Sequence, residues 1–222
     1  MISGISKVAA WSLLLAGALL ASPSRATPPE AKLDAATLVA ALKREAPART
    51  AYAEVRFSGL LDRPLVLHGE LEYLGPGQLG KRVDAPYKEQ TKVANGEASV
   101  QRGSRAPRTF SLGQAPELEG FLRGFAALLG GDAAALARDF TLAASGSTDA
   151  WQLVLKPRDV RLARRVTAIT VDGSGSTPLC FRTREADGDL SVLLVDRLAE
   201  AKLAVQVSQP QVDALCRGIE AK

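Results

Sequence analysis

The amino-acid sequence predicts an α+β fold in which one curved antiparallel sheet carries helices on one face. Short segments of alternating apolar and polar residues follow one another without helices between them, which favours an antiparallel meander. One helical pattern precedes these segments, and two more divide them into an earlier and a later series. No fixed repeat or interdomain linker interrupts the chain, so residues 27–222 are predicted to form one domain with a C-terminal tail from about residue 198.

The first helix is predicted over residues 33–46, where apolar side chains recur at helical spacing. Asp34 or Thr37 suits its N-cap position, because a short polar side chain can accept a hydrogen bond from an unpaired backbone N–H of the first turn. Pro47 ends the pattern, since proline lacks the N–H that a helix interior needs.

The clearest strand runs from Leu65 to Tyr73 and ends in a Gly-Pro-Gly turn. Its apolar phase consists of Leu65, Leu67, Gly69, Leu71 and Tyr73. The strand before it has Val55, Phe57 and Gly59 on its apolar phase and Glu54, Arg56 and Ser58 on its polar phase. Further strands are predicted at 78–83, 87–94, 97–102 and 108–112. Asn95-Gly96 predicts a two-residue hairpin turn between two of them.

The central helix is predicted over residues 117–129, followed by a short helix over 132–138. Six apolar side chains share one face of the central helix: Leu118, Phe121, Leu122, Phe125, Leu128 and Leu129. The later strands are predicted at 140–144, 151–156, 164–172, 179–184 and 190–196. The tail is predicted to contain a strand at 202–207 and a short helix at 210–218.

Composition excludes several classes of protein. The 222 residues are 46% hydrophobic with a formal charge of +4, which excludes an intrinsically disordered chain. Only the N-terminus offers an apolar run that approaches membrane-spanning length, so a polytopic membrane protein is excluded. No basic cluster with interleaved aromatic residues indicates a nucleic-acid partner.

The N-terminus has the order of a secretory signal peptide over residues 1–26. Lys7 precedes an apolar run over residues 8–21, and Ser24 and Ala26 suit a cleavage site after Ala26. An uncleaved anchor is the alternative, although the run is short for a spanning helix. The sequence therefore predicts an exported protein.

No catalytic constellation is recognisable. His68 is the only histidine, and its place on the polar phase of a strand indicates an ordinary exposed side chain. Residues 173–176 read Gly-Ser-Gly-Ser but lack the Lys-Ser/Thr ending of a phosphate loop, so they indicate a hairpin connection. We expect no catalytic residue, no metal site and no cofactor.

Cys180 and Cys216 are the only cysteines, and in an exported protein an even pair favours a disulfide. This bond would join a late strand to the tail. A catalytic thiol is the alternative, but neither cysteine has a C-x-x-C partner.

The apolar face of the central helix has two interpretations. It can pack on the sheet as an ordinary core helix. It can instead cover an apolar trough, if the sheet curves without closing, and such a trough would receive acyl chains. Composition does not choose between a filled core and a trough.

The order of elements resembles the LolA family of periplasmic lipoprotein carriers. The resemblance rests on the first helix, F-S-G at 57–59, H-G-E-L-E-Y-L-G-P-G-Q-L at 68–79 and W-Q-L-V-L-K-P at 151–157, in that order. It implies an unclosed antiparallel β-barrel with an N-terminal helix and a central helical lid over a hydrophobic cavity. It also implies a monomer in the periplasm, with an inner-membrane releasing transporter and an outer-membrane receptor as partners.

Acyl chains of lipoproteins or related lipids are the expected ligands. The expected site combines a strand face of Phe57, Leu71, Tyr73, Trp151 and Leu153 with a lid face of Leu118, Phe121, Leu122 and Phe125. A lipid-sensing regulatory domain of the RseB type, or a carrier of a non-lipoprotein lipid, is the alternative. A hydrolase is disfavoured, because no activated nucleophile is visible.

Overall fold

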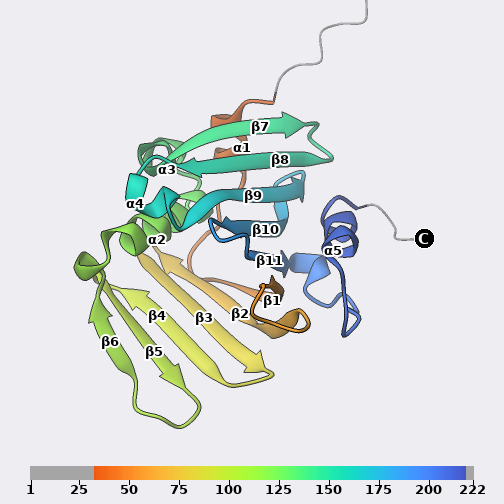
Figure 1. Ribbon diagram of the computed structural model, residues 1–222. Coiled ribbons are helices and arrows are strands. Elements are labelled where there is room, and N and C mark those ends of the chain that lie inside the picture. The colour runs from red at the N-terminus through yellow and green to blue at the C-terminus, as the bar shows by residue number, and fades with distance from the viewer. Residues whose placement is uncertain (1–32, 219–222) are drawn as a thin grey trace, which may run out of the picture. The chain divides into compact units, whose positions relative to one another are not determined.

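The computed structural model describes residues 33–218, apart from the side chain of Glu117, and the predicted signal peptide lies outside these residues. Eleven strands form one antiparallel sheet in the order β6-β5-β4-β3-β2-β1-β11-β10-β9-β8-β7 (Figure 1). The strands are β1 (Ala48–Phe57), β2 (Leu65–Gly75), β3 (Gln78–Ala85), β4 (Glu89–Ala94), β5 (Glu97–Arg102), β6 (Arg108–Ser111), β7 (Phe140–Gly146), β8 (Trp151–Pro157), β9 (Val166–Ser174), β10 (Thr177–Glu185) and β11 (Leu190–Val195). The helices are α1 (Ala35–Ala41), α2 (Pro116–Leu129), α3 (Ala133–Asp139), α4 (Val160–Ala163) and α5 (Gln209–Cys216), with short 3₁₀ turns at η1 (Leu112–Gln114) and η2 (Asp196–Leu198).

The sheet is not closed into a barrel. Strand β1 pairs with both β2 and β11, so strands β2–β6 extend from one side of it and strands β7–β11 from the other. Strands β6 and β7 are the two edges, and within residues 33–218 no pairing joins them. The predicted α+β fold with an unclosed antiparallel sheet is therefore confirmed.

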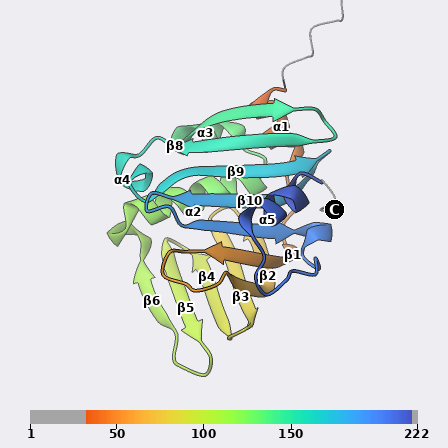
Figure 2. The ribbon, with the colours of Figure 1, turned by 45° about the vertical axis from the view of Figure 1, so that its right-hand side comes forward.

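The sheet has two faces, each covered by different helices (Figure 2). We call the face that packs against α1, α2 and α3 the inner face, and its core includes Leu38, Leu128, Leu136 and Leu153. The opposite, outer face packs against α5. Its smaller core consists of Ala53, Val55, Cys180, Leu190, Val192, Leu194, Val207, Val212 and Cys216.

Local sequence signals explain most element boundaries. The Asn95-Gly96 turn joins β4 to β5, with φ angles of 53° and 75° that suit a two-residue hairpin, so this prediction is confirmed. The Asp34 carboxylate accepts a hydrogen bond from the Thr37 N–H at 2.7 Å, which makes Asp34 the N-cap of α1. Residues 173–176 include the end of β9 and the two-residue turn, Gly175-Ser176, that connects it to β10, so the predicted hairpin connection is confirmed.

Several boundaries were predicted wrongly. Helix α1 is shorter than the expected 33–46, and β1 begins at Ala48 because backbone pairing with β2 extends the strand beyond its alternating part. The expected strand at 202–207 does not exist: Leu203 and Val207 instead pack against the outer-face core. The short helix α4 was not predicted, although Asp159 caps it with hydrogen bonds from the N–H groups of Arg161 and Leu162.

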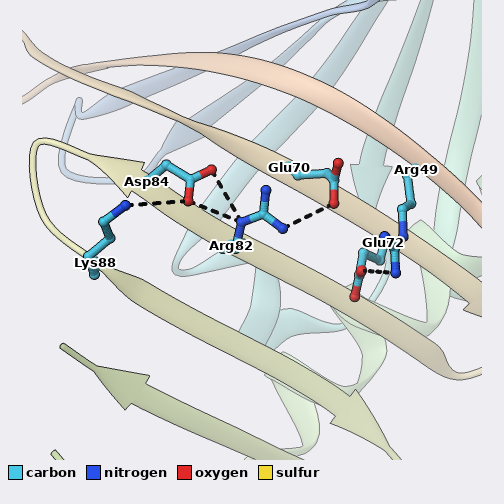
Figure 3. A network of polar contacts seen from close by, with 6 residues as sticks. All are labelled: Arg49, Glu70, Glu72, Arg82, Asp84 and Lys88. Atoms are coloured by element: carbon cyan, nitrogen blue, oxygen red, sulfur yellow. Dashed lines mark hydrogen bonds and ion pairs between the residues drawn. The ribbon is translucent and has the colours of Figure 1, made fainter. Parts of the chain in front are cut away.

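The outer face of β2 and β3, together with Arg49 of β1, is charged rather than apolar (Figure 3). Arg82 lies between Glu70 and Asp84, at 3.2 Å and 3.0 Å, and Arg49 pairs with Glu72 at 3.1 Å. Most of these side chains are substantially exposed, so this part of the outer face is a solvated surface. None of the helices in residues 33–218 has the length and hydropathy to cross a membrane.

A cavity between the sheet and helix α2

A cavity of about 910 Å³ lies between the inner face and α2. This volume falls within the range of about 300–1,000 Å³ that small-molecule sites occupy. Strands β1, β2, β3, β4, β10 and β11 and helix α2 contribute its walls. Its apolar lining includes Phe57, Leu65, Leu71, Tyr73, Leu79, Val93, Phe121, Leu122, Phe125, Leu129, Phe181, Leu190, Leu193 and Val195.

Strand register places the wall residues in rows. Leu71 lies opposite Thr50 on β1 and Lys81 on β3, and Tyr73 lies opposite Ala48 and Leu79. Because alternate residues of a strand share one face, these residues all reach the inner face.

Helix α2 supplies the roof of the cavity with one side of its apolar face. Phe121, Leu122, Phe125 and Leu129 are spaced so that they line this side together. Phe125 also contacts Phe181 on β10, with ring centroids 5.4 Å apart, which joins the roof to the sheet.

Six of the nine predicted site residues line this cavity: Phe57, Leu71, Tyr73, Phe121, Leu122 and Phe125. Phe57 also packs against the outer-face core, because it follows the phase of Val55. Leu118 instead lines an adjacent pocket of about 620 Å³, which shares Phe121 with the main cavity. That these residues bind a ligand stays a prediction.

Trp151 and Leu153 lie outside the cavity. Their side chains are only 3% and 0% exposed and belong to the inner-face core, where α1 and α3 cover β7 and β8. The Trp151 indole N–H donates to the Gly175 carbonyl at 2.8 Å, so its polar atom is satisfied. These two residues pack the fold in this structure.

Sequence reasoning missed the charged residues of the cavity lining, three of which contact one another. Glu54 is 3% exposed, and both of its carboxylate oxygens accept hydrogen bonds. Arg56 Nε donates at 2.7 Å and Ser191 Oγ at 2.7 Å to Oε1, and Lys81 Nζ donates at 2.5 Å to Oε2. We call Glu54, Arg56 and Lys81 the charged cluster.

The sequence-based prediction placed the wrong phase of β1 on the inner face. Val55 and Ala53 face the outer-face core under α5, so Glu54 and Arg56 must face the cavity. A strand with apolar cores on both faces gives no simple rule for which phase points inward. The one feature of the sequence that indicates charge on the inner face is Lys81, which lies on the same phase of β3 as the apolar residues Leu79 and Val83.

The electrostatics of the charged cluster favour the ionised carboxylate. Burial acts to raise the pKa of Glu54, but the charges of Lys81 and Arg56 outweigh this effect and hold its pKa at about 2. The Lys81 ammonium also lies 5.1 Å from the ring centroid of Tyr52, within cation–π range. Gly69 makes this arrangement possible, because a Cβ there would lie 3.1 Å from the Tyr52 ring and 1.8 Å from the Arg82 carbonyl oxygen.

The structure contains the predicted disulfide between Cys180 and Cys216, which joins β10 to α5 across 36 residues of sequence. Both thiols are consumed by this bond, so the catalytic-thiol alternative is excluded for this structure. His68 is exposed, as expected. In the described part of the chain, no three or more His, Cys, Asp or Glu side chains gather in a way that could hold a metal ion.

Solved structures of low sequence identity resemble this chain. A LolA superfamily protein, NE2245 from Nitrosomonas europaea, is 11% identical with a TM-score of 0.43, over 80% of this chain and 99% of that one. LprF from Mycobacterium bovis is 11% identical with a TM-score of 0.36, over 78% and 92%. In the Pseudomonas aeruginosa MucA/MucB complex, one chain is 17% identical with a TM-score of 0.36, over 79% of this chain and 62% of that one.

No curated protein sequence is significantly similar to the chain. The protein family described as "Outer membrane lipoprotein carrier protein LolA-like", by contrast, matches residues 26–219. This match spans all eleven strands, α2 and the disulfide. The chain therefore belongs to the LolA-like family of outer membrane lipoprotein carrier proteins.

Proposed function

We propose that this protein is a periplasmic carrier that binds the acyl chains of lipoproteins or related lipids and delivers them towards the outer membrane. The observation that carries the proposal is the apolar lining of the cavity beneath α2. Family membership and the signal-peptide pattern of residues 1–26 support it. The proposal includes the transporter and receptor partners that the family resemblance implies.

Binding would draw on the burial of apolar surface. Each CH₂ group removed from water contributes about 0.8 kcal/mol, so a chain of ordinary fatty-acid length supplies ample affinity. Release then requires a partner that offers a better apolar site or that favours an open cavity, because a ligand shifts only the states that it binds differently. Helix α2 is the element that would have to move, since it forms the roof.

The substitution Phe121→Asp tests the proposal. A carboxylate at this position would face the cavity, so we expect the displacement of a fluorescent fatty-acid probe to show at least tenfold weaker binding. Phe110→Asp is the matched control, because Phe110 is exposed on the edge strand β6 and lies outside the cavity lining. Unchanged binding by folded Phe121→Asp protein would overturn the assignment of the cavity.

Native mass spectrometry of protein purified from the periplasm identifies the cargo. We expect a bound lipoprotein or free lipid on the natural protein and its loss from Phe121→Asp. A membrane-anchored regulatory protein recovered without any lipid would contradict the carrier function and favour the RseB-type alternative.

A further inference from the structure

The charged cluster of Glu54, Arg56 and Lys81 stands in a cavity wall that also carries a large apolar lining. We propose that Lys81, supported by Arg56, is the anchor for the anionic headgroup of the bound amphiphile, a carboxylate or a phosphate. This inference rests on the proposed function and adds the class of ligand. An acyl chain alone would give no reason for charges at this position.

The hydrogen bonds of the cluster leave donors unused. Glu54 pairs with both cations, and its two oxygens accept three hydrogen bonds. An ammonium has three donors and a guanidinium five. Within residues 33–218, Lys81 and Arg56 each make one hydrogen bond, and both line the cavity. A charge of +1 therefore remains on the cluster, together with free donors.

Stability alone does not explain why charged side chains stand at this position. Removing charges from water costs several kcal/mol for each ion, and apolar residues of similar volume often replace a buried ion pair without loss. The neighbours of Lys81 across the strands are Leu71 and Thr91, so an apolar side chain would continue the wall. A ligand that binds to Lys81 and Arg56 would explain these charges.

Other carboxylates line the cavity besides Glu54. Glu72 lies opposite Gly80, next to Lys81, and its carboxylate pairs with Arg49 at 3.1 Å. Asp196 lines the cavity at the start of η2. Glu185 on β10 and Asp189 in the β10–β11 turn also line it. In the sheet order, β3 and β10 are separated by β2, β1 and β11, which is about 19 Å along the sheet at ordinary strand spacing. Asp189 is moreover an acceptor for the Gly59 N–H at 3.3 Å. Because Glu72 is paired with Arg49, the charged cluster keeps its own excess charge of +1 for an anion at Lys81.

The apolar tail of such a ligand has a surface beside its headgroup. Leu71 lies directly opposite Lys81 on β2. Leu79 and Val93, a cross-strand pair, follow on the same inner face, and Leu122 of α2 packs against this group. The tail would therefore extend from Lys81 along these residues under α2.

Three probes with the same saturated chain test the anchor on the purified full-length mature protein. Palmitate carries a carboxylate, hexadecyl phosphate carries a phosphate, and hexadecanol carries neither. We expect both anions, or one of them, to bind roughly ten- to a hundredfold more tightly than hexadecanol, as one hydrogen bond between charged groups provides. The stronger of the two anions identifies the headgroup chemistry.

Lys81→Met should remove this preference and leave hexadecanol binding unchanged, while Lys81→Arg should retain it. Lys92→Met is the matched control: Lys92 lies on the neighbouring strand β4, is exposed, and has the opposite phase to Thr91, which pairs with Lys81. If Lys81→Met unfolds because Glu54 loses a partner, the double substitution Glu54→Gln and Lys81→Met removes both charges together.

The outcomes separate the two proposals. Equal binding of all three probes by the natural protein would overturn the anchor and leave the carrier function standing. A preference for anions that survives in folded Lys81→Met would also overturn it. If none of the probes binds, the cavity assignment itself fails, and the carrier function fails with it.

Discussion

The inner face of the sheet serves two different purposes in its two halves. In the filled half, formed by β7–β9, residues such as Leu153 and Val171 are fully buried in the inner-face core. In the hollow half, formed by β1–β4, residues such as Leu71 and Leu79 have the same alternation but line a cavity. The comparison shows that strand pattern specifies an apolar face, whereas helix placement decides whether that face is packed or left open.

Helices α1, α3 and α4 contact the filled half, whereas α2 contacts β2 and forms the roof of the cavity in the hollow half. The outer faces differ in a related way. Strands β10 and β11 are covered by α5 and held by the Cys180–Cys216 disulfide, whereas β2 and β3 expose a charged surface. Stability is therefore expected to concentrate in one half and ligand binding in the other.

The largest difference is expected from a matched pair of truncations. Leu153→Ala should lower the free energy of unfolding by about 2–5 kcal/mol, because it creates a cavity in a packed core. Leu71→Ala should lower it by about 1 kcal/mol, because a residue at an existing cavity has fewer packing partners to lose. Urea denaturation followed by circular dichroism measures both. Equal losses would show that the hollow half is packed like the filled half.

The disulfide provides a second test, on the part of the outer face that α5 covers. Replacing Cys180 and Cys216 together by Ala should lower the free energy of unfolding by about 2–4 kcal/mol, since the bond closes a long loop. Fatty-acid binding by the folded variant should not change, because neither cysteine lines the cavity. Chemical denaturation and probe titration measure the two effects, and a large loss of affinity would contradict the separation of the halves.

Sequence reasoning could predict the elements that depend on local signals. The apolar phase of β2, the Asn95-Gly96 hairpin and the amphipathic face of α2 all lie in contiguous residues, and the structure confirms them. The disulfide was predicted from the number of cysteines and the expected export of the protein, not from the positions of the two cysteines in the sequence.

The choice between packed and open sites depended on long-range arrangement and could not be predicted in the same way. Trp151 and Leu71 both lie on the apolar phase of an alternating strand. Trp151 is packed in the core and Leu71 lines the cavity because α1 and α3 lie over the part of the sheet that contains Trp151. Glu54 reaches the cavity because α5, more than 150 positions away in sequence, covers the other phase of β1. The tail residues 202–207 alternate like a strand, but they pack by their side chains against the outer-face core instead of pairing.

The charged cluster predicts a pH dependence that belongs to the hollow half. The pKa of Glu54 is lowered from 4.5 to about 2 in the folded protein, so its ionisation favours folding. This contribution is complete above pH 4.5 and is lost as the pH falls through 2. Between pH 6 and pH 2, the free energy of unfolding should therefore fall by a few kcal/mol less in Glu54→Gln than in the natural protein. Unfolding curves of both proteins across this pH range measure the difference. Identical slopes for the two proteins would contradict the depressed pKa.

The smallest effect is expected on the exposed outer face of the hollow half, where Arg82 pairs with Glu70 and Asp84 (Figure 3). Its side chain is 47% exposed, so solvent screens these pairs and Arg82→Ala should lower the free energy of unfolding by less than about 1 kcal/mol. Arg182→Ala is the matched substitution on the part of the outer face that α5 covers. Arg182 is 16% exposed between Asp172 and Asp213, and its loss leaves the nearly buried Asp172 carboxylate without its cation.

Breaking such a buried pair typically costs about 3–5 kcal/mol, so Arg182→Ala should unfold at clearly lower urea than Arg82→Ala. A double-mutant cycle with Glu70→Ala isolates the coupling of the exposed pair, which should fall below about 1 kcal/mol and weaken further in salt. A coupling as large as the loss at Arg182 would mean that the outer face of β2 and β3 is covered in solution. The hollow half would then be protected on a side that this structure leaves open to solvent.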